Sequence, residues 1–118
     1  MDALTLRAKI REARKIDIAI PDTNIVFYAT RMTGEEFRAI VDNNVSDAEI
    51  SRRYVIGWQG VTEADIIEEG SSKVEVPFDK GLFDDIIGDK DDWFLYIASN
   101  VGRAALDRVS AKASNAKK

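Results

Sequence analysis

Isoleucines alternate with polar or small residues near the start of the chain, over residues 15–21. Ile16, Ile18 and Ile20 share one face of an extended backbone, with an aspartate and an alanine on the other. This period of two in β-branched residues predicts a half-buried strand. A turn-forming Asp-Thr-Asn sequence and a second β-rich segment follow directly. The pattern therefore predicts a β-hairpin over residues 15–30.

The segment before the hairpin, residues 1–14, is basic and carries a weaker apolar pattern. Leu6, Ile10 and Ala13 recur there at helical spacing, which is compatible with a short helix. The same residues could instead extend the first strand. The pattern alone leaves these two alternatives open.

Two S/T-x-x-E sequences after the hairpin, residues 33–36 and 46–49, match the capping box that begins many helices. The first predicts a helix that ends at an Asn-Asn pair. The second predicts a helix in which Ile50, Tyr54 and Trp58, spaced four apart, form one apolar face. Two glycines next to the tryptophan are expected to end this second helix.

The C-terminal half contains an acidic stretch and two further helical patterns. Residues 63–73 indicate a loop with at most one turn of helix. Asp79 is a good N-cap for a short helix that buries Phe83 and Ile87, and an Asp-Asp pair begins the last helix. Beyond Val109 the apolar stripe disappears, so the end of the chain is expected to fray.

Together these patterns predict an α+β fold in which an N-terminal β-hairpin is followed by about four α-helices. The length of 118 residues matches one small domain with a single core. The predicted parts of this domain, residues 1–118, are a basic N-terminal segment (1–14), the β-hairpin (15–30), a helical part (33–105) and a disordered tail (110–118).

The composition excludes several classes of chemistry. Without cysteine the chain has no disulfide, zinc–thiolate site or thiol nucleophile. The lack of histidine removes the commonest general base and metal ligand. No apolar run approaches the ~20 residues that span a bilayer, and the N-terminus lacks the order of a secretory signal. We therefore expect no membrane association, no metal and no cofactor, in a chain that stays in the cytoplasm.

Charges are segregated along the chain. Residues 1–15 hold five basic and two acidic residues, residues 61–92 three basic and eleven acidic, and residues 102–118 five basic and one acidic. The basic ends could meet the acidic middle within one molecule or between subunits, which predicts self-association. Alternatively, the charges only form solvated faces. The net charge of −4 disfavours nucleic-acid binding by the chain as a whole.

No candidate for a catalytic centre stands out. The densest acidic cluster, residues 84–92, lacks the order of a calcium-binding loop and is better explained by helix caps and solvent-facing acids. A serine nucleophile would need a base, and no Ser-x-x-Lys sequence occurs. Arg52 and Arg53 could contact nucleic acid together with Tyr54 and Trp58, but the shared apolar face of these aromatic residues favours core packing. We expect no enzymatic activity.

Two short segments, Tyr54-Val-Ile-Gly-Trp-Gln-Gly-Val61 and Val76-Pro-Phe-Asp79, resemble the small tail assembly chaperones of bacteriophages and prophages. In those proteins a helix ends in a Gly-Trp-x-Gly-Val turn, and a loop leads to a Pro-Phe-Ser/Asp helix start with a following leucine. The resemblance covers about residues 15–105, and the chain departs from the family in a longer acidic insert around residues 63–72. The matching positions are Gly57, Trp58, Gly60, Val61, Pro77, Phe78, Asp79 and Leu82.

The resemblance implies a non-catalytic protein of the bacterial host cytoplasm, which binds the long, helical tape-measure protein and helps the tail-tube protein polymerise around it. Such binding requires an apolar face that accepts an amphipathic helix. The candidate surfaces are the apolar faces of the second helix and of the short helix, and the hairpin edge at residues 25–30. For Trp58, core packing and partner contact both stay open. The candidate partner-contact residues are Ile25, Phe27, Ile50, Tyr54, Trp58, Phe83 and Ile87.

Two other functions compete with this hypothesis. A structural virion component, such as a tail-completion or head–tail connector protein, would use the hairpin edge and the segregated charges to form a ring. A small regulatory nucleic-acid-binding domain would use the basic ends together with Arg52 and Arg53. Presence in purified particles separates the first alternative from a chaperone, and a gel shift tests the second.

Overall fold

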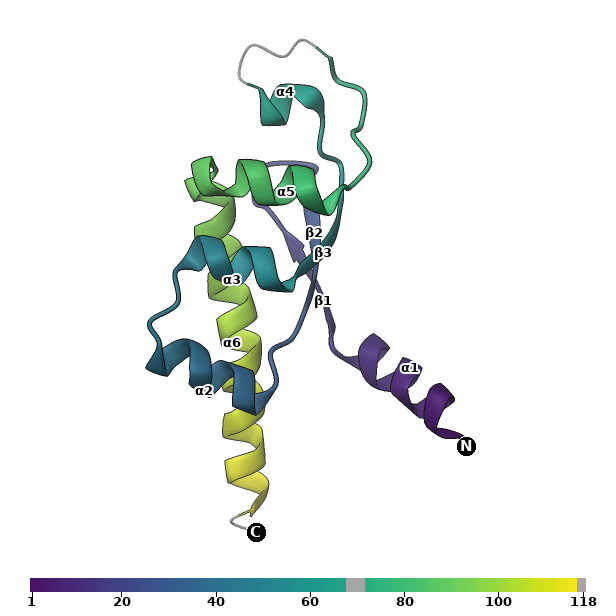
Figure 1. The fold of residues 1–118 in the computed structure, drawn as a ribbon, viewed down its shortest axis with the longest axis vertical. Helices are drawn as coiled ribbons and strands as arrows, with labels where there is room; N and C mark the ends of the chain where they lie inside the picture. The colour runs from purple at the N-terminus through teal and green to yellow at the C-terminus, as the bar shows by residue number, and fades with distance from the viewer. Residues whose placement is uncertain (68–71, 117–118) are drawn as a thin grey trace.

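A three-stranded antiparallel sheet and six α-helices make up the part of the chain described by the computed structural model, residues 1–67 and 72–116 (Figure 1). The elements in chain order are α1 (Ala3–Ala13), β1 (Lys15–Ala19), β2 (Val26–Thr30), α2 (Gly34–Asp42), α3 (Asp47–Tyr54), β3 (Val55–Gln59), α4 (Glu63–Ile66), α5 (Lys80–Ile86), the 3-10 helix η1 (Ile87–Asp89) and α6 (Asp91–Ala116).

The predicted hairpin is present, as strands β1 and β2. Ile18 pairs with Phe27, and the amide of Ile20 donates to the carbonyl of Ile25 over 2.9 Å. Asp22 has a φ of 62°, a left-handed conformation that aspartate tolerates better than most residues. The side chains of Ile18 and Ile20 face the core as predicted, since both are buried.

The predicted order of a hairpin followed by about four helices is wrong, because a third strand lies between helices. Helix α3 ends at Tyr54, and the next five residues form β3, which pairs with β2. The register shifts beside Ala29, so that Ile56 is an extra residue in β3. This bulge lets Val55 and Trp58, three positions apart, both point into the core. Because of the bulge, the buried residues of β3 do not alternate with a period of two. The four-residue spacing of Tyr54 and Trp58 is instead the spacing expected of a continuous helix.

A helix also precedes the hairpin, which the fold prediction did not include. Of the two alternatives for residues 1–14, the structure has the helix, α1, which begins with Asp2 as its N-cap. The predicted short helix after Asp79 is present as α5, and the acidic segment holds one short helix, α4; residues 68–71 of that segment lie outside the described part. At the other end α6 continues to Ala116, where the sequence predicts a disordered tail; residues 117–118 lie outside the described part.

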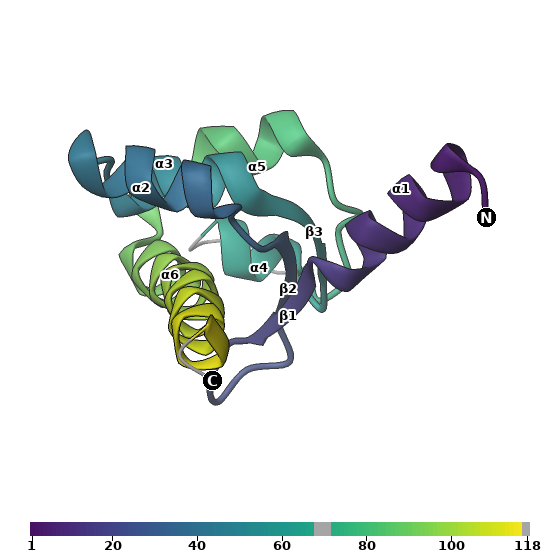
Figure 2. The same cartoon turned by 90° about the horizontal axis from the view of Figure 1, so that it is seen from below.

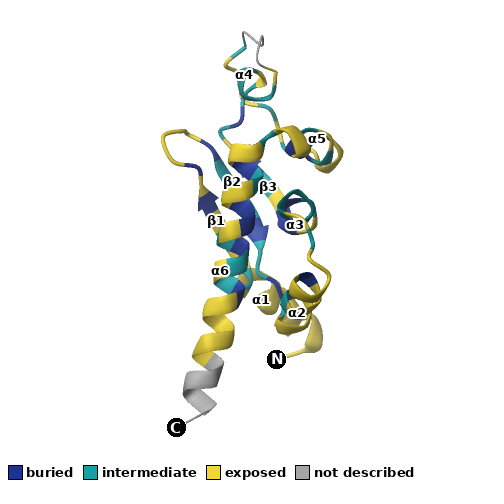
Figure 3. Cartoon of the chain, turned by 90° about the vertical axis from the view of Figure 1, so that its left-hand side faces the viewer, coloured by how far each residue is buried: buried dark blue, intermediate teal, exposed yellow. Residues whose placement is uncertain are grey.

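Helices α5 and α6 pack on one face of the sheet. Helix α6 contacts α2, α3, β1 and β2, and buried residues gather where these elements meet (Figure 3). Phe27 on the central strand is fully buried, with its ring 5.2 Å from that of Trp93 on α6 and 6.0 Å from that of Phe83 on α5. On the opposite face of the sheet, Asp17 and Gln59 are exposed. The domain therefore has two layers, with one side of its sheet open.

Candidate functional site

The seven residues predicted to contact a partner all lie in the hydrophobic core. Phe27, Phe83 and Ile87 have no exposed surface, and Trp58 is 7% exposed. Core packing is therefore the observed role of Trp58. A partner could reach these side chains only by opening the core. The three others, equally buried, are Ile25, Ile50 and Tyr54.

The hairpin edge predicted at residues 25–30 is not an edge. Strand β2 lies in the middle of the sheet, with β1 on one side and β3 on the other. Its backbone groups are already paired on both sides, so they cannot receive a further strand. The edge strands of the sheet are β1 and β3.

The two segments that carry the family resemblance meet in space. The indole nitrogen of Trp58 donates to the carbonyl of Val76 over 2.7 Å, and the Trp58 ring lies edge-on to Phe78 with 5.1 Å between ring centroids. The Val76 amide donates to the carbonyl of Val61, also over 2.7 Å. Pro77 is exposed beside this contact. Trp58 thus fastens the end of the acidic loop to the sheet.

The glycines and the cap of these segments have structural roles. Gly60 has a φ of 81°, and a Cβ atom there would overlap the carbonyl oxygen of Asn24. At Gly57 a Cβ atom would lie 3.4 Å from the Tyr28 ring. As predicted, Asp79 is the N-cap of α5 and accepts the amide of the partly buried Leu82 over 2.8 Å. The matching positions therefore shape a junction of the fold.

A buried tyrosine pairs with a carboxylate between α2 and α3. Tyr54 Oη donates to Glu36 Oε2 over 2.8 Å, and burial together with this hydrogen bond raises the pKa of Tyr54 to about 12. Burial alone would raise the pKa of Glu36, but hydrogen bonds from Thr33 and Tyr54 and the charge of Arg14 outweigh it and lower that pKa. Both groups are therefore held in the charge state they have at neutral pH, which suits a structural pair rather than proton transfer.

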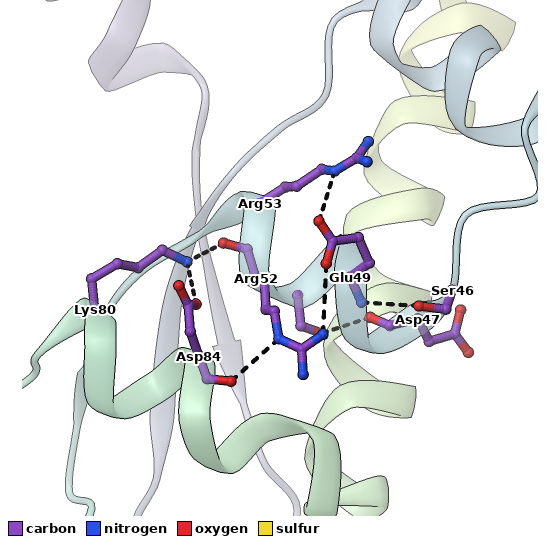
Figure 4. Close-up of polar contacts among 8 residues, drawn as sticks. Ser46, Asp47, Glu49, Arg52, Arg53, Lys80 and Asp84 are labelled. Carbon is purple, nitrogen blue, oxygen red and sulfur yellow. Dashed lines mark hydrogen bonds and ion pairs between the residues drawn. The ribbon is translucent and has the colours of Figure 1, made fainter.

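A connected group of polar side chains joins α3 to α5 (Figure 4). Lys80 Nζ lies 2.9 Å from Asp84 Oδ1 and also donates to the carbonyl of Arg52, whose Nε donates to the carbonyl of Asp84 over 3.3 Å. Glu49 pairs with both Arg52 and Arg53, at 3.6 and 3.3 Å. These side chains are about one-third to one-half exposed, so each pair adds little stability. The arginines weighed for nucleic-acid contact are therefore engaged within the chain.

Helix α1 differs from every element of the core, because none of its residues is buried. It stands away from the sheet and from the other helices in both principal views (Figures 1 and 2). Leu4 is 76% exposed and Leu6 50% exposed, and Ile10 is also exposed. Leu6 and Ile10 lie one turn apart on the same face of α1, so together they form an apolar stripe that a partner helix could cover.

Two arginines, Arg14 and Arg31, lie side by side where α1 joins the sheet. The Arg31 amide donates to the carbonyl of Arg14 over 2.7 Å. Burial lowers the pKa of Arg31, and the positive charges of Arg108 and Arg14 lower it further. Sequence reasoning missed this pair, because Arg14 and Arg31 are brought together only by the pairing of β1 with β2.

The described residues hold no group of three or more acidic side chains placed to bind a metal ion. Among the same residues, no helix is both long enough and apolar enough to cross a bilayer. Comparisons of the chain with protein-family models, curated proteins and solved structures found no match. The resemblance to tail assembly chaperones therefore stays a prediction.

Proposed function

We propose that this chain is a non-catalytic, tail-assembly-chaperone-like protein of a bacteriophage or prophage, which binds an amphipathic helix of a tape-measure protein. The observation that carries the proposal is the exposure of α1, an 11-residue helix without a buried residue. A helix of this length has little stability of its own in water. Covering its apolar side chains with a partner would stabilise both the helix and the complex.

The pattern on α1 defines the chemistry of the partner. Leu6 and Ile10 lie one turn apart on the same face, and the basic residues Arg7, Lys9 and Arg11 lie beside this stripe. A complementary helix would carry an apolar stripe flanked by acidic residues. Long helical proteins such as the tape-measure protein have many such stripes. The resemblance to tail assembly chaperones implies that the tape-measure protein is the partner.

The contact between Trp58 and Val76 supports the family interpretation. The resemblance rests on two segments that are distant in sequence, and the 2.7 Å hydrogen bond joins them into one unit. Segments that form one unit are expected to recur together in a family. This unit forms part of the core, so the partner surface is on α1.

The test is co-purification with a helix-rich fragment of a tape-measure protein, which the proposal predicts to be encoded near this gene. We expect Leu6→Asp with Ile10→Asp to weaken binding by about tenfold or more, because both apolar contacts become charged. The matched control, Thr5→Asp with Ala8→Asp, adds the same charge on the opposite face of α1 and should bind nearly as the unmodified chain. Equal losses in both variants would contradict a specific stripe.

A second measurement separates a chaperone from a component of the particle. A chaperone leaves before the tail is complete, so mass spectrometry of purified particles should not detect the chain. Stoichiometric amounts in mature particles would overturn the proposal. Failure of the fragment to bind or to stay dispersed in the presence of the chain would do the same.

A further inference from the structure

Strand β1 lies at an edge of the sheet, and half of its backbone hydrogen-bonding groups face outward. The Ile20 amide, just past β1, donates to the carbonyl of Ile25, so the even-numbered residues of this segment bond to the β2 side. Bonded positions alternate along antiparallel strands. The odd-numbered residues Lys15, Asp17 and Ala19 therefore direct their amides and carbonyls away from β2, where no strand of the described residues lies. An added strand could pair with these groups.

The two edges of the sheet differ in their regularity. Strand β3 carries the bulge at Ile56, which interrupts pairing along its side of the sheet. Strand β1 pairs with β2 over its whole length without a shift in register, and its outward residues Lys15, Asp17 and Ala19 are exposed. Helix α1, which precedes β1, projects away from the sheet (Figure 2). The regular edge that can accept another strand is therefore β1.

The exposed side chains of β1 are self-complementary when two copies of the strand run antiparallel. Because the outward groups come from odd-numbered residues, Lys15 of one copy can lie directly opposite Asp17 of the other, and the symmetric pair forms as well. Among the described residues Asp17 forms no ion pair, and Lys15 lies 2.9 Å from Glu12. That pair is largely exposed and contributes little, so Lys15 can exchange it for Asp17 of a second copy.

Ile16 would lie at the two-fold axis of this arrangement. Its side chain is only partly buried against the core, and facing its own copy would cover the remaining apolar surface. Two other alignments keep the outward groups paired, but both lack the charge pairs. With Asp17 at the axis, two carboxylates face each other, and with Ile18 at the axis, Asp17 faces Ala19. Charge complementarity therefore favours Ile16 at the axis.

We propose that β1 is the docking surface for β1 of a second copy of this chain, aligned antiparallel with Ile16 at the two-fold axis. The two three-stranded sheets then form one continuous sheet. An extended segment of another protein is the competing occupant of this edge. A second copy is favoured because β1 itself supplies both charges in the matching alignment. The contact is independent of the proposed function, since it needs neither a tape-measure protein nor the apolar stripe of α1.

A charge exchange measured by sedimentation velocity tests the pairing. Lys15→Asp and Asp17→Lys should each weaken association by about tenfold or more, because like charges then face each other at both symmetric positions. The double variant, Lys15→Asp with Asp17→Lys, should associate as the unmodified chain does. The alignment with Asp17 at the axis would not recover in the double variant, because two lysines would meet there.

A proline tests the backbone pairing separately. Asp17→Pro removes an amide that the ladder between β1 and β2 does not use, so the variant should keep its fold, as checked by circular dichroism. Its association should fall below detection at about 100 μM protein, a concentration suited to a small interface. The matched control Asp17→Ala removes the same charge but keeps the amide, and should still associate within about tenfold of the unmodified chain.

A single introduced cysteine reports the alignment, because the chain has none of its own. At the axis the two Cα atoms of residue 16 would be about 4.5 Å apart, within the range of a disulfide. Ile16→Cys should therefore form a disulfide-linked dimer under mild oxidation. The control Ala39→Cys, at an exposed position of α2, should stay monomeric under the same conditions.

Three results would overturn the inference. An unmodified chain that is monomeric at about 100 μM would leave the β1 edge to a segment of another protein. A double charge variant as weak as the single ones would exclude the charge pairs. Cross-linking through Asp17→Cys in place of Ile16→Cys would put the wrong residue at the axis. Asp17→Pro should still bind the tape-measure fragment, and Leu6→Asp with Ile10→Asp should still self-associate, so this proposal and the proposed function can fail separately.

Discussion

Trp58 and Leu6 both belong to apolar patterns with helical spacing, yet Trp58 is buried in the structure and Leu6 is exposed. Trp58 is 7% exposed and hydrogen-bonded to the loop that crosses it, whereas Leu6 is 50% exposed and belongs to a helix with no buried residue. An apolar stripe therefore predicts that a surface will be covered. It does not predict whether the cover comes from the same chain or from another one.

The two regions also differ in how they are held. The ring of Trp58 contacts aromatic residues from β2, from α5 and from the segment before α5. Helix α1 continues directly into β1, and the ion pair between Glu12 and Lys15 at its end is largely exposed. We therefore expect the core to unfold cooperatively and α1 to open at a much lower free energy.

The largest contrast between the regions should come from removing one apolar side chain in each. Phe27→Ala leaves a cavity at the centre of the core and should lower the free energy of unfolding by about 3–5 kcal/mol. Leu4→Ala on α1 should change it by less than about 0.5 kcal/mol. Urea denaturation followed by tryptophan fluorescence measures both. Similar losses in the two variants would mean that α1 belongs to the core.

A backbone position in the Trp58 region should give the next largest effect. Gly60→Ala forces a side chain onto a φ of 81° and against the carbonyl of Asn24, so we expect a loss of about 2–4 kcal/mol. Gly102→Ala in α6 is the control, because a Cβ atom there meets nothing within 4 Å. That variant should stabilise the helix by about 0.5–1 kcal/mol, again measured by urea denaturation. A neutral Gly60→Ala would show that this turn rearranges freely.

The elements predicted correctly are those whose signals are local. The alternating isoleucines gave the hairpin, the Thr33 capping box is formed in full, and Asp79 caps α5. In the second box Ser46 accepts the amide of Glu49, while the Glu49 carboxylate binds Arg53. Side-chain caps depend on residues three positions apart, so the sequence contains the whole interaction.

The errors arose where the structure depends on distant residues. The bulge at Ile56 is set by pairing with β2, and without that pairing Val55 and Trp58 do not show the period of a strand. The same missed strand made β2 look like an edge. The proximity of Arg14 and Arg31 could not be predicted either, because it depends on the pairing of β1 with β2.

The hydrogen bond of Trp58 can be removed while most of its apolar surface is kept. Trp58→Phe leaves the carbonyl of Val76 without its donor and should cost about 1–3 kcal/mol. Amide exchange should also become faster at Val76, whose own amide binds Val61. Hydrogen exchange measured by NMR tests this local effect. Unchanged exchange at Val76 would show that the loop is held by Phe78 and not by the indole.

A pH series tests how much the pair of Tyr54 and Glu36 stabilises the edge of the core. The pKa of Tyr54 is raised from 10.0 to about 12, so its contribution to stability is complete below pH 10 and is lost as the pH rises towards 12. The pKa of Glu36 is lowered below 4.5, so its contribution is present above pH 4.5 and disappears as the pH falls through the lower value.

Tyr54→Phe tests this pair directly. The substitution should cost about 1 kcal/mol near neutral pH, where the hydroxyl donates to Glu36, and should abolish the alkaline loss of stability between pH 10 and 12. Urea midpoints across the pH range provide the measurement. An alkaline loss of the same size in the variant would assign that loss to another group.

Removing α1 altogether should also have little effect on stability. A chain that begins at Arg14 keeps the bond between the Arg14 carbonyl and the Arg31 amide and loses only the exposed ion pair of Glu12 and Lys15. Such pairs contribute about 0.2–1 kcal/mol, so the urea midpoint should barely move. Binding of the tape-measure fragment should disappear, because the apolar stripe is gone. A truncated chain that unfolds several kcal/mol more easily would show that α1 packs on the domain in solution, and the contrast between Leu6 and Trp58 would then be one of degree.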